Sequence, residues 1–367
     1  MKFTCEKSTL QKEISIAQEI ISTRNALSIL SNVLLVAEEG SVTIKATDLK
    51  VNFKTDIPAD VAEEGDTTVF CDKLLGILRS LPEGDVEFEL TDGRVVIRPL
   101  FKKIDFQLKS IAGDKFPEFQ ELPDENFFEF TQKEFIEMIG QTIFAVSDDE
   151  TRYFMNGVYL EKKDGGLSMV ATDGRRLSYI EKVISGEIPD FEAVIVPPKI
   201  LQLVRKLASG EGNVKVAVGE KSIFIRLGNQ RISSSLIEGQ FPNYKRVIPE
   251  QQDHFAEVNR ATLEEALKRV SLLVEQKSRR IYVQLSEGTL TLFSEESEIG
   301  AAKEELDCSY MGESITIALN YLYLLEPLKI IEEEDVVIRF SEANKAITLL
   351  SKPEKDFFHI VMPMQLD

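Results

Sequence analysis

The carboxylates and histidines that could carry out catalysis do not form a spaced catalytic set in this sequence. Asp148, Asp149 and Glu150 make the densest acidic cluster and could hold a magnesium ion, which prefers oxygen ligands. A metal cage draws its ligands from spaced positions, whereas three consecutive acidic residues are typical of a solvated loop. The two histidines, His254 and His359, lack the spacing of a metalloprotease motif, and a surface or interface position is expected for each. A magnesium-dependent enzyme acting on nucleic acid is therefore kept only as the alternative, and no metal and no cofactor are predicted.

Asp173, in the segment ATDG, is the strongest single candidate for a catalytic carboxylate. Its counterpart Asp48 lies in the similar segment ATDLK, where the neighbouring residues differ. A turn-forming role explains both residues at once, because aspartate side chains accept hydrogen bonds from the backbone that follows them. The sequence also lacks a phosphate-binding glycine loop, a dinucleotide motif and a nucleophile elbow. These patterns favour a protein without catalysis of its own, and no catalytic residue is predicted.

Length and charge limit the class of protein further. The chain has 367 residues, 43% of them hydrophobic, which is enough for two to three domains with sizeable cores. Its 62 acidic residues outnumber 43 basic ones, and the net charge of −19 argues against a protein that binds nucleic acid with its whole surface. The three cysteines are odd in number and widely spaced, which predicts neither a disulfide framework nor a zinc site. A charged start and the lack of an apolar run of about 20 residues predict a cytoplasmic protein without membrane contact.

The chain repeats itself at a spacing close to one third of its length. The segment ATDLKVNF, which contains Thr47, returns as ATDGRRLSY around Thr172, 125 residues later. The segment FPEF at Phe116 returns as FPNY at Phe241, again 125 residues later. A third, fainter copy follows with an offset of 122 residues. Self-similarity of this kind indicates tandem domains, and the three predicted repeats are 1–122, 126–249 and 253–367.

Each repeat carries two helical patterns and several strand-like runs. Leu10, Ile14 and Ala17 place one apolar stripe on the first helix, and Leu74 with Leu78 does the same for the second. Short alternating runs such as VEFEL and SIFIRL indicate antiparallel strands. The predicted fold class is therefore α+β, with three tandem repeats in which two helices pack on one face of an antiparallel sheet.

For two later helices, the residue spacing indicates more clearly where the helix begins. Thr131 is followed three residues later by Glu134, and Thr262 is followed in the same way by Glu265. This spacing predicts a capping box, in which the two side chains bond each other's backbone N–H groups at the start of a helix. The second of these helices is predicted to span 262–280.

Several segments together resemble the family of bacterial sliding clamps, the beta subunits of DNA polymerase III. The resemblance covers the full length and rests on the opening MKFT, on ATDLKV and ATDGRRL, on FPNYKRVIP and on the closing VMPMQLD. It implies the DNA clamp fold and a homodimer that closes head to tail into a ring. It also implies a non-catalytic processivity factor that encircles double-stranded DNA without reading its sequence. The implied partners are the clamp loader, the polymerase III catalytic subunit, and other polymerases and repair proteins that bind through short peptides.

Packing arithmetic agrees with a dimer. Six helices from one chain, packed side by side at about 10 Å, would close a circle too narrow for a duplex. Twelve helices from two chains would leave a bore of roughly 28 Å, which admits B-DNA of about 20 Å width with a water layer. A head-to-tail contact closes into such a ring when its rotation completes the circle.

The resemblance assigns residues to three surfaces. The residues predicted to contact DNA are Arg24, Lys73, Arg79, Tyr153, Phe154, Lys199, Arg205, Lys206, Lys277 and Arg279. The residues predicted to form a cleft for partner peptides are Met155, Thr172, Gly174, Arg175, Arg176, Leu177, Pro242, Val247, Asn320, Tyr323, Ala346, Ile360, Val361, Met362, Pro363, Met364 and Leu366. The residues predicted at the dimer interface are Lys73, Ile77, Lys102, Lys103, Phe106, Leu108, Leu272, Leu273, Glu298, Glu304 and Glu305.

Charge patterning and two departures from the family qualify these assignments. The helix predicted over 198–208 carries three cations and no acidic residue, which suits contact with phosphates. The helices predicted over 8–22 and 131–145 each have a net charge of −1, so the bore cannot be uniformly positive. Asp149 stands where family members often carry a polar amide, and Arg175 replaces a common histidine.

Overall fold

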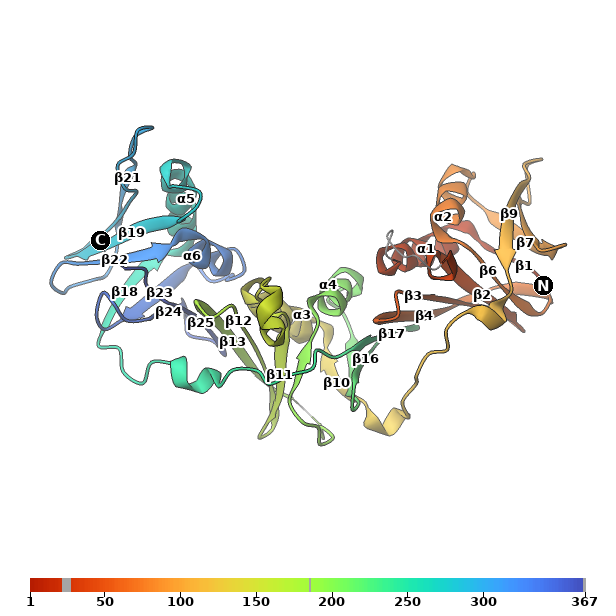
Figure 1. Ribbon diagram of the computed structural model, residues 1–367, viewed down its shortest axis with the longest axis horizontal. Helices are drawn as coiled ribbons and strands as arrows, with labels where there is room; N and C mark the ends of the chain where they lie inside the picture. Colours follow the sequence, from red (N-terminus) through yellow and green to blue (C-terminus); the bar gives the residue numbers. More distant parts are fainter. Residues whose placement is uncertain (22–27, 185, 366–367) are drawn as a thin grey trace. The chain divides into compact units, whose positions relative to one another are not determined.

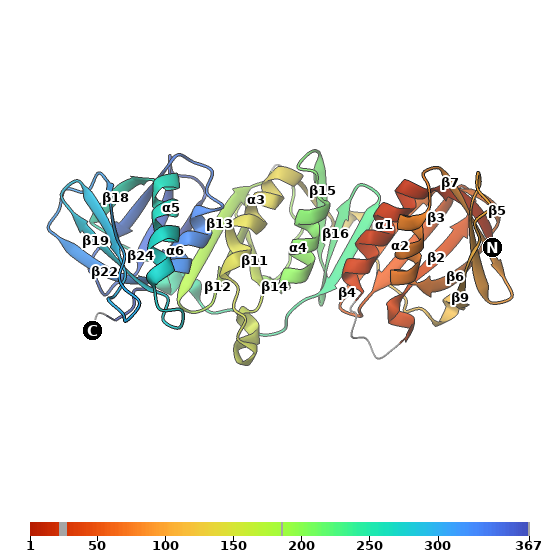
Figure 2. The same ribbon diagram turned by 90° about the horizontal axis from the view of Figure 1, so that it is seen from above.

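The computed structural model describes residues 1–21, 28–184 and 186–365, apart from the side chains of Ser28 and Glu125. Arg24 and Leu366, predicted above as site residues, lie outside the described residues. The chain divides into two compact units, drawn in Figures 1 and 2. Unit 1 comprises Met1–Phe130 and Gly212–Leu236, and unit 2 comprises Thr131–Glu211 and Ile237–Asp367. Within the described residues, none of the helices combines the length and the apolar character that crossing a membrane demands.

Unit 1 is built on an antiparallel sheet of thirteen strands within the described part of the chain. Their order is β10-β15-β16-β17-β4-β3-β2-β6-β9-β8-β7-β1-β5. Their bounds are β1 (Lys2–Glu6), β2 (Asn32–Glu38), β3 (Ser41–Thr47), β4 (Val51–Pro58), β5 (Asp60–Glu63), β6 (Gly65–Phe70), β7 (Asp85–Thr91), β8 (Arg94–Pro99), β9 (Phe106–Ile111), β10 (Phe128–Thr131), β15 (Asn213–Val218), β16 (Ser222–Leu227) and β17 (Gln230–Ser235).

Two helices of unit 1, α1 (Lys7–Ile20) and α2 (Cys71–Ser80), lie side by side (Figure 2). The predicted apolar stripes are confirmed, because Leu10 and Leu78, for example, are fully buried. Helix α1 packs against β3 and β4, and α2 packs against β6 and β9. Burying one leucine side chain contributes roughly 1.5 to 3 kcal/mol, so these stripes hold the helix pair on the sheet.

Unit 2 contains two antiparallel sheets in the described residues. The larger has the strand order β14-β11-β12-β13-β25-β24-β23-β18, and the smaller has the order β21-β20-β19-β22. Their bounds are β11 (Val158–Lys163), β12 (Gly166–Thr172), β13 (Arg176–Val183), β14 (Val194–Val196), β18 (His254–Asn259), β19 (Arg280–Ser286), β20 (Thr289–Phe293), β21 (Lys303–Asp307), β22 (Ile315–Asn320), β23 (Asp335–Phe340), β24 (Ile347–Lys352) and β25 (Phe357–Val361). The helices are α3 (Gln132–Thr142), α4 (Pro198–Leu207), α5 (Arg260–Val270) and α6 (Tyr321–Leu328).

The prediction of helices on one face of one sheet is too simple for the third repeat. Its strands are divided between the two sheets of unit 2. Helix α5 contacts β20 and β21 of the small sheet and also β18 of the large sheet, while α6 contacts β22 and β25. The helix pair thus contacts both sheets of unit 2, which together cover its apolar side chains.

One of the two predicted capping boxes is confirmed and the other is wrong. Thr131 and Glu134 bond each other's backbone as predicted at the start of α3. In α5 the cap is instead Asn259, whose Oδ1 accepts a hydrogen bond from the Thr262 backbone N–H at 3.0 Å, so the helix begins at Arg260.

The predicted end of α5 at residue 280 is also wrong. The helix stops at Val270, and a 3-10 turn, η7 (Ser271–Leu273), follows it. The next regular element is β19, which begins at Arg280. Lys277 and Arg279 therefore lie in a connecting segment, and the helix itself carries three cations against two acidic residues.

The sheet of unit 1 and the larger sheet of unit 2 each cross a predicted repeat boundary. In unit 1, β4 of the first repeat pairs with β17 of the second. In unit 2, β13 of the second repeat pairs with β25 of the third. We call the β4–β17 pair with the linker 116–127 the first junction, and the β13–β25 pair with the linker 241–252 the second junction. Periodicity gave no indication of this pairing, because it reports which residues are buried and not which strands meet.

Candidate peptide cleft and associated surfaces

The start of β13 is shaped by a hydrogen-bonded turn. Asp173 Oδ1 accepts hydrogen bonds from the backbone N–H groups of Arg175 at 2.9 Å and Arg176 at 3.1 Å. The Thr172 hydroxyl oxygen accepts one from the Gly174 N–H at 3.0 Å. Gly174 has a φ of 87°, a conformation that glycine adopts without steric cost. The prediction that Asp173 forms a turn is confirmed, and the turn directs β13 into the second junction.

The start of β4 is built in the same way. Asp48 Oδ1 accepts from the backbone N–H groups of Lys50 at 2.9 Å and Val51 at 2.7 Å. Leu49 takes the place of Gly174 and has a φ of 75°, which is strained for a residue with a side chain. The first junction thus keeps the turn although it lacks the glycine.

A cavity of about 150 Å³ lies at the second junction. Leu177 and Ile360, opposite each other in the β13–β25 register, form part of its wall, and both are almost fully buried. Predicted cleft residues that the structure brings together here are Met155, Thr172, Gly174, Arg176, Leu177, Pro242, Val247, Ile360 and Met362. Apolar walls with a few polar groups are typical of sites that take an apolar side chain from a peptide.

Sequence reasoning missed two residues of this cavity, Asn243 and Tyr244. Tyr244 is buried and its hydroxyl donates a hydrogen bond to Glu161 at 2.7 Å, which fixes the ring at the cavity wall. Both residues belong to the repeated segment FPNY, and this repetition was the signal that could have found them.

The other described cleft candidates lie around the cavity rather than in its lining. Val361 is 1% exposed and is buried on β25, while Asn320 caps α6 by accepting from the Leu322 N–H. The backbone of the C-terminal segment is held at two points, because the Met362 N–H donates to Arg175 O at 2.9 Å and the Met364 N–H donates to Ala318 O at 2.8 Å. The remaining predicted residues outside the lining are Tyr323, Ala346 and Pro363.

Arg176 is held by several partners beside the cavity. Its Nε donates to Asp173 at 3.1 Å, and its Nη atoms donate to the carboxylate of Glu326 and to the backbone oxygen of Phe144. The ring of Tyr323 lies 4.6 Å from the guanidinium carbon, a cation–π contact. The guanidinium is therefore fixed in direction, and a peptide that bonds it competes with Glu326.

His359 lies beneath the same strands and is buried, whereas the sequence led us to expect a surface or interface position. It is 2% exposed, between Ser178 and Gln141. The Gln141 amide oxygen accepts from Nε2 at 3.1 Å, so Nδ1 accepts from the Ser178 hydroxyl at 3.0 Å. Burial, with a smaller contribution from the charge of Arg176, lowers the pKa of His359 to about 3. The neutral imidazole thus joins α3, β13 and β25 under the cleft.

The acidic cluster at Asp148 to Glu150 has a structural explanation. Asp149 Oδ1 accepts hydrogen bonds from the Thr151 hydroxyl at 2.6 Å and its N–H at 3.0 Å, and Oδ2 accepts from Arg152 Nε at 2.9 Å. These bonds lower the pKa of the Asp149 carboxyl to about 2, with the Thr151 hydroxyl contributing most. Residues 1–21, 28–184 and 186–365 contain no group of three side chains suited to hold a metal ion. Asp149 instead caps the 3-10 segment η5 (Glu150–Met155).

Most of the predicted DNA-contacting residues that the structure describes are exposed, and they lie on several elements. Helix α4 carries Lys199, Arg205 and Lys206 on its solvent side and no acidic residue. In η5, Tyr153 is 53% exposed and packs edge-on against Phe154. The other exposed candidates of the described chain are Lys73 and Arg79 on α2, and Lys277 and Arg279 before β19.

The predicted dimer residues of unit 2 lie near its small sheet. Leu272 in η7 is 78% exposed, and Leu273 lies beside Gly300. Strand β21 is an edge strand of the small sheet and carries Glu304 and Glu305. Glu304 already accepts hydrogen bonds from Arg269 of the same chain at 2.6 and 2.9 Å. The acidic side of the predicted seam is therefore partly neutralised within the chain.

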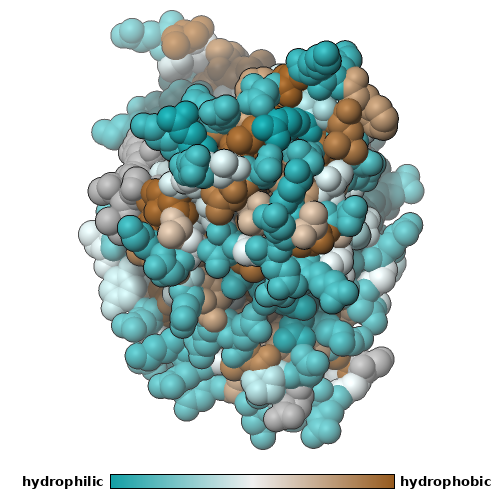
Figure 3. Space-filling view, turned by 90° about the vertical axis from the view of Figure 1, so that its right-hand side faces the viewer, coloured by the Kyte–Doolittle hydropathy of each residue, from teal (hydrophilic) through white to brown (hydrophobic). Residues whose placement is uncertain are grey.

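The predicted dimer residues of unit 1 lie on α2, β9 and the segment between β8 and β9. Phe106, Leu108 and Ile77 are half-buried, and Lys102 and Lys103 are exposed. Strand β9 pairs with β6 only at its end, so one side of Phe106 to Lys109 has no strand partner in the described residues. The face in Figure 3 is mostly hydrophilic, with separate hydrophobic spots among polar side chains.

Comparisons with known proteins cover the whole chain. Three family descriptions match it in order: DNA polymerase III beta subunit, N-terminal domain (residues 1–120), central domain (129–243) and C-terminal domain (245–365). The beta sliding clamp of Treponema pallidum is 48% identical over 371 residues, with 100% of both chains covered. The beta sliding clamp of Pseudomonas aeruginosa is 35% identical, again over the full length of both.

Solved structures give the same result. A crystal structure of a sliding clamp from Pseudomonas aeruginosa bound to griselimycin matches with a TM-score of 0.95 at 33% identity, covering 100% of both chains. A sliding clamp from Bacillus subtilis matches with a TM-score of 0.96 at 23% identity over both full lengths, which shows a shared fold.

Proposed function

The chain belongs to the DNA polymerase III beta subunit family, and we propose that two copies close head to tail into a ring that encircles duplex DNA. It is a sliding clamp, a non-catalytic accessory subunit that keeps a polymerase on its template. The observation that carries this function is the match of three consecutive family domains over the full chain. The magnesium-dependent alternative lacks support, because Asp149 is engaged by Thr151 and Arg152.

Two features support the proposed dimer. In the part of the chain that the structure describes, one side of β9 at Phe106 to Lys109 and the outer edge of β21 have no strand partner, so a second chain could pair with their backbone groups. Leu272 and Ile299, which are 78% and 87% exposed, are large apolar side chains that an interface would cover. The seam would combine β9 and α2 of one copy with β21 and η7 of the other.

DNA binding is proposed to rest on backbone-directed cations. Lys199, Arg205 and Lys206 give α4 a charge of +3 in a chain of −19. Such cations neutralise phosphates without reading base edges, which suits a ring that slides. We expect the protein to act in the cytoplasm, on double-stranded DNA of any sequence.

The second junction is proposed to bind short peptides of partner proteins. Its cavity offers apolar walls from Leu177 and Ile360, an adaptable side chain from Met362, and directed donors from Arg176. The proposed partners are the catalytic subunit of the polymerase, the clamp loader, and other polymerases and repair proteins. Deletion of residues 364–367 should abolish peptide binding and leave the dimer intact, and unchanged binding would refute this cleft.

The ring function is tested by release from DNA. The wild-type protein should dissociate slowly from a nicked circular plasmid and rapidly after a single cut makes the same plasmid linear, because only the circle keeps a closed ring linked to it. Leu273→Asp should sediment as a single chain and leave both DNA forms equally fast. Val183→Asp is a matched control, since Val183 is 81% exposed and outside the proposed seam. Equal residence of the wild-type protein on both forms would contradict the proposal.

A further inference from the structure

The two junctions have the same strand register. At the second junction, Arg176 pairs with Val361, and at the first, Val51 pairs with Ser234. Val51 and Arg176 are 125 residues apart, as are the repeated landmarks of the sequence, and each follows the same aspartate turn. Each residue that lines the peptide cleft from β13 or β25 therefore has a counterpart at the first junction.

The counterparts of the apolar cleft residues are polar. Asn52 stands in the place of Leu177, and Ser233 stands in the place of Ile360. The Asn52 amide donates a hydrogen bond to the Ser233 hydroxyl oxygen at 3.1 Å. Both line a hollow of about 40 Å³, whereas the cavity at the second junction measures about 150 Å³. The first junction thus keeps a hollow and changes its chemistry.

Cations gather around this hollow. Lys54, Arg226 and Arg231 all line it, in a chain whose net charge is −19. Arg231 is the strand partner of Lys54, so their side chains emerge on the same face of the sheet. The guanidinium carbon of Arg226 lies 3.8 Å from the centre of the Phe127 ring. The pocket therefore combines positive charge with an aromatic face.

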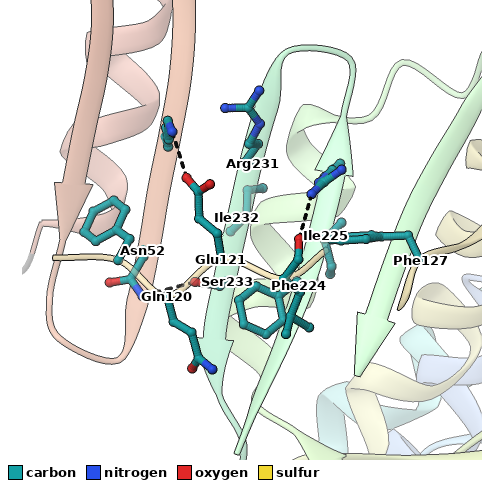
Figure 4. A pocket seen from close by; sticks show the side chains of 13 residues that line it. Asn52, Gln120, Glu121, Phe127, Phe224, Ile225, Arg231, Ile232 and Ser233 are labelled. Atoms are coloured by element: carbon teal, nitrogen blue, oxygen red, sulfur yellow. Dashed lines mark hydrogen bonds and ion pairs between the residues drawn. The ribbon is translucent and has the colours of Figure 1, made fainter. Parts of the chain in front are cut away.

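The linker of the first junction places carboxylates on two of these cations, while Arg231 pairs with Asp56 of β4 at 3.4 Å. Lys54 Nζ lies 2.7 Å from Glu121 Oε1, and Arg226 pairs with Asp124. Figure 4 shows the linker crossing the strands, with Glu121 and Arg231 directed to the same side and Gln120 directed to the other. The hydrogen bond from Lys54, with smaller contributions from other cations, lowers the pKa of the Glu121 carboxyl. Two carboxylates of the linker are therefore already paired with cations that line this hollow.

These internal ion pairs can be displaced at little cost. The side chains of Glu121 and Asp124 are 61% and 90% exposed, against 21% and 25% for Lys54 and Arg226, so water screens the carboxylate end of each pair and reduces its contribution to stability. A ligand that brings several carboxylates into the groove would replace both and could also reach Arg231.

We propose that the first junction is a second peptide-docking groove, which binds an extended acidic segment of a partner protein through Lys54, Arg226 and Arg231. The carboxylates of that segment replace Glu121 and Asp124, which act as weak internal competitors. This groove goes beyond the apolar cleft, because it selects a partner by charge and leaves the second junction free for another peptide.

The probe for this groove is a labelled peptide with the sequence of residues 118–127, EFQELPDENF, titrated by fluorescence anisotropy at low salt. Its control is a neutral copy with glutamine and asparagine in place of the acidic residues. Glu121→Gln combined with Asp124→Asn should bind the acidic peptide about tenfold more tightly than the wild-type protein, because the internal competitors are gone. Lys54→Gln combined with Arg226→Gln should lose binding.

Arg94→Gln serves as the matched charge control, since Arg94 is an exposed cation of unit 1 on β8, outside the groove. It should bind the acidic peptide like the wild-type protein, and so should the chain that lacks residues 364–367. Thermal unfolding verifies that each variant is folded. Equal binding of the acidic and neutral peptides, no binding to the variant without competitors, or loss of binding on deleting residues 364–367 would each overturn the proposal. The deletion also separates the two sites, because it tests the apolar cleft without touching this groove.

Discussion

The first and second junctions have the same backbone and opposite chemistry on each face. On the face that lines the cavity, the second junction has Leu177 and Ile360, where the first has Asn52 and Ser233. At the neighbouring residue of each strand, on the opposite face of the sheet, the pattern reverses. The second junction buries Ser178 and His359, where the first buries Phe53 and Ile232.

This comparison separates the residues that hold a junction from the residues that give it a ligand. Neighbouring residues on a strand face opposite sides, so the pair that binds and the pair that supports can change independently. The first junction is held by a buried apolar pair, whereas the second is held by a buried hydrogen-bonded chain through His359. The duplicated backbone therefore predicts where a junction lies, whereas a few side chains decide which ligand the junction can bind.

The largest expected effect is the loss of binding of an apolar peptide when a polar residue of the first junction replaces its apolar counterpart at the second. Leu177→Asn should weaken the binding of a leucine-containing partner peptide about 100-fold. The substitution removes an apolar side chain from the cavity wall and puts a polar group in its place. Isothermal titration measures the affinity, and thermal unfolding verifies the fold. Asn52→Leu is the matched control and should leave this affinity unchanged. Similar losses in both variants would mean that the two junctions do not act separately.

The next effect concerns the buried imidazole, which only the second junction has. His359 has a pKa of about 3 in the folded chain and an ordinary value near 6.5 when unfolded. The unfolded state therefore binds more protons between these values, and stability falls as the pH decreases through that window. Between pH 7 and pH 5, protonation of His359 in the unfolded state should lower the free energy of unfolding by about 2 kcal/mol.

Urea unfolding of the wild-type protein and of His359→Gln, each at pH 7 and at pH 5, gives the free energy of unfolding. The contribution of His359 is the difference between the two proteins in how much this free energy falls on acidification. The variant should lose less stability on acidification, because its amide does not titrate. Parallel losses in the two proteins would show that the imidazole is not the titrating group.

The smallest effect distinguishes the two turns. Gly174→Ala should destabilise the chain by about 1 to 2 kcal/mol, because alanine is strained at positive φ and its Cβ would lie 2.9 Å from Arg152 Nη1. Leu49→Gly relieves the same strain at the first junction but raises the conformational entropy of the unfolded chain. Because the two effects oppose each other, it should change the free energy of unfolding by less than about 1 kcal/mol. Thermal unfolding compares the two, and an equal loss in both would contradict the difference between the turns.

Local signals in the sequence predicted local structure well. The repeated aspartates Asp48 and Asp173 form the same turn, and the capping box at Thr131 is present. At Thr262 the same spacing was misleading, because Asn259 offers a competing cap three residues earlier. Propensity alone cannot choose between two caps that both suit the backbone.

Long-range features could not be predicted from periodicity. The pairing of β4 with β17 joins residues that are far apart in the chain, and His359 finds its partners on α3 and β13. The bond between Arg269 and Glu304 likewise depends on how β21 folds back beside α5. The family resemblance supplied most of the cavity-lining residues, but it missed Asn243 and Tyr244, which the internal repeat of FPNY would have indicated.

Whether two chains form a closed ring is tested most directly by electron microscopy of the purified protein at working concentration. We predict a closed ring of two chains around an open centre wide enough for duplex DNA, and single chains for Leu273→Asp. An open arc or a single-chain particle in the wild-type sample would contradict the proposed function.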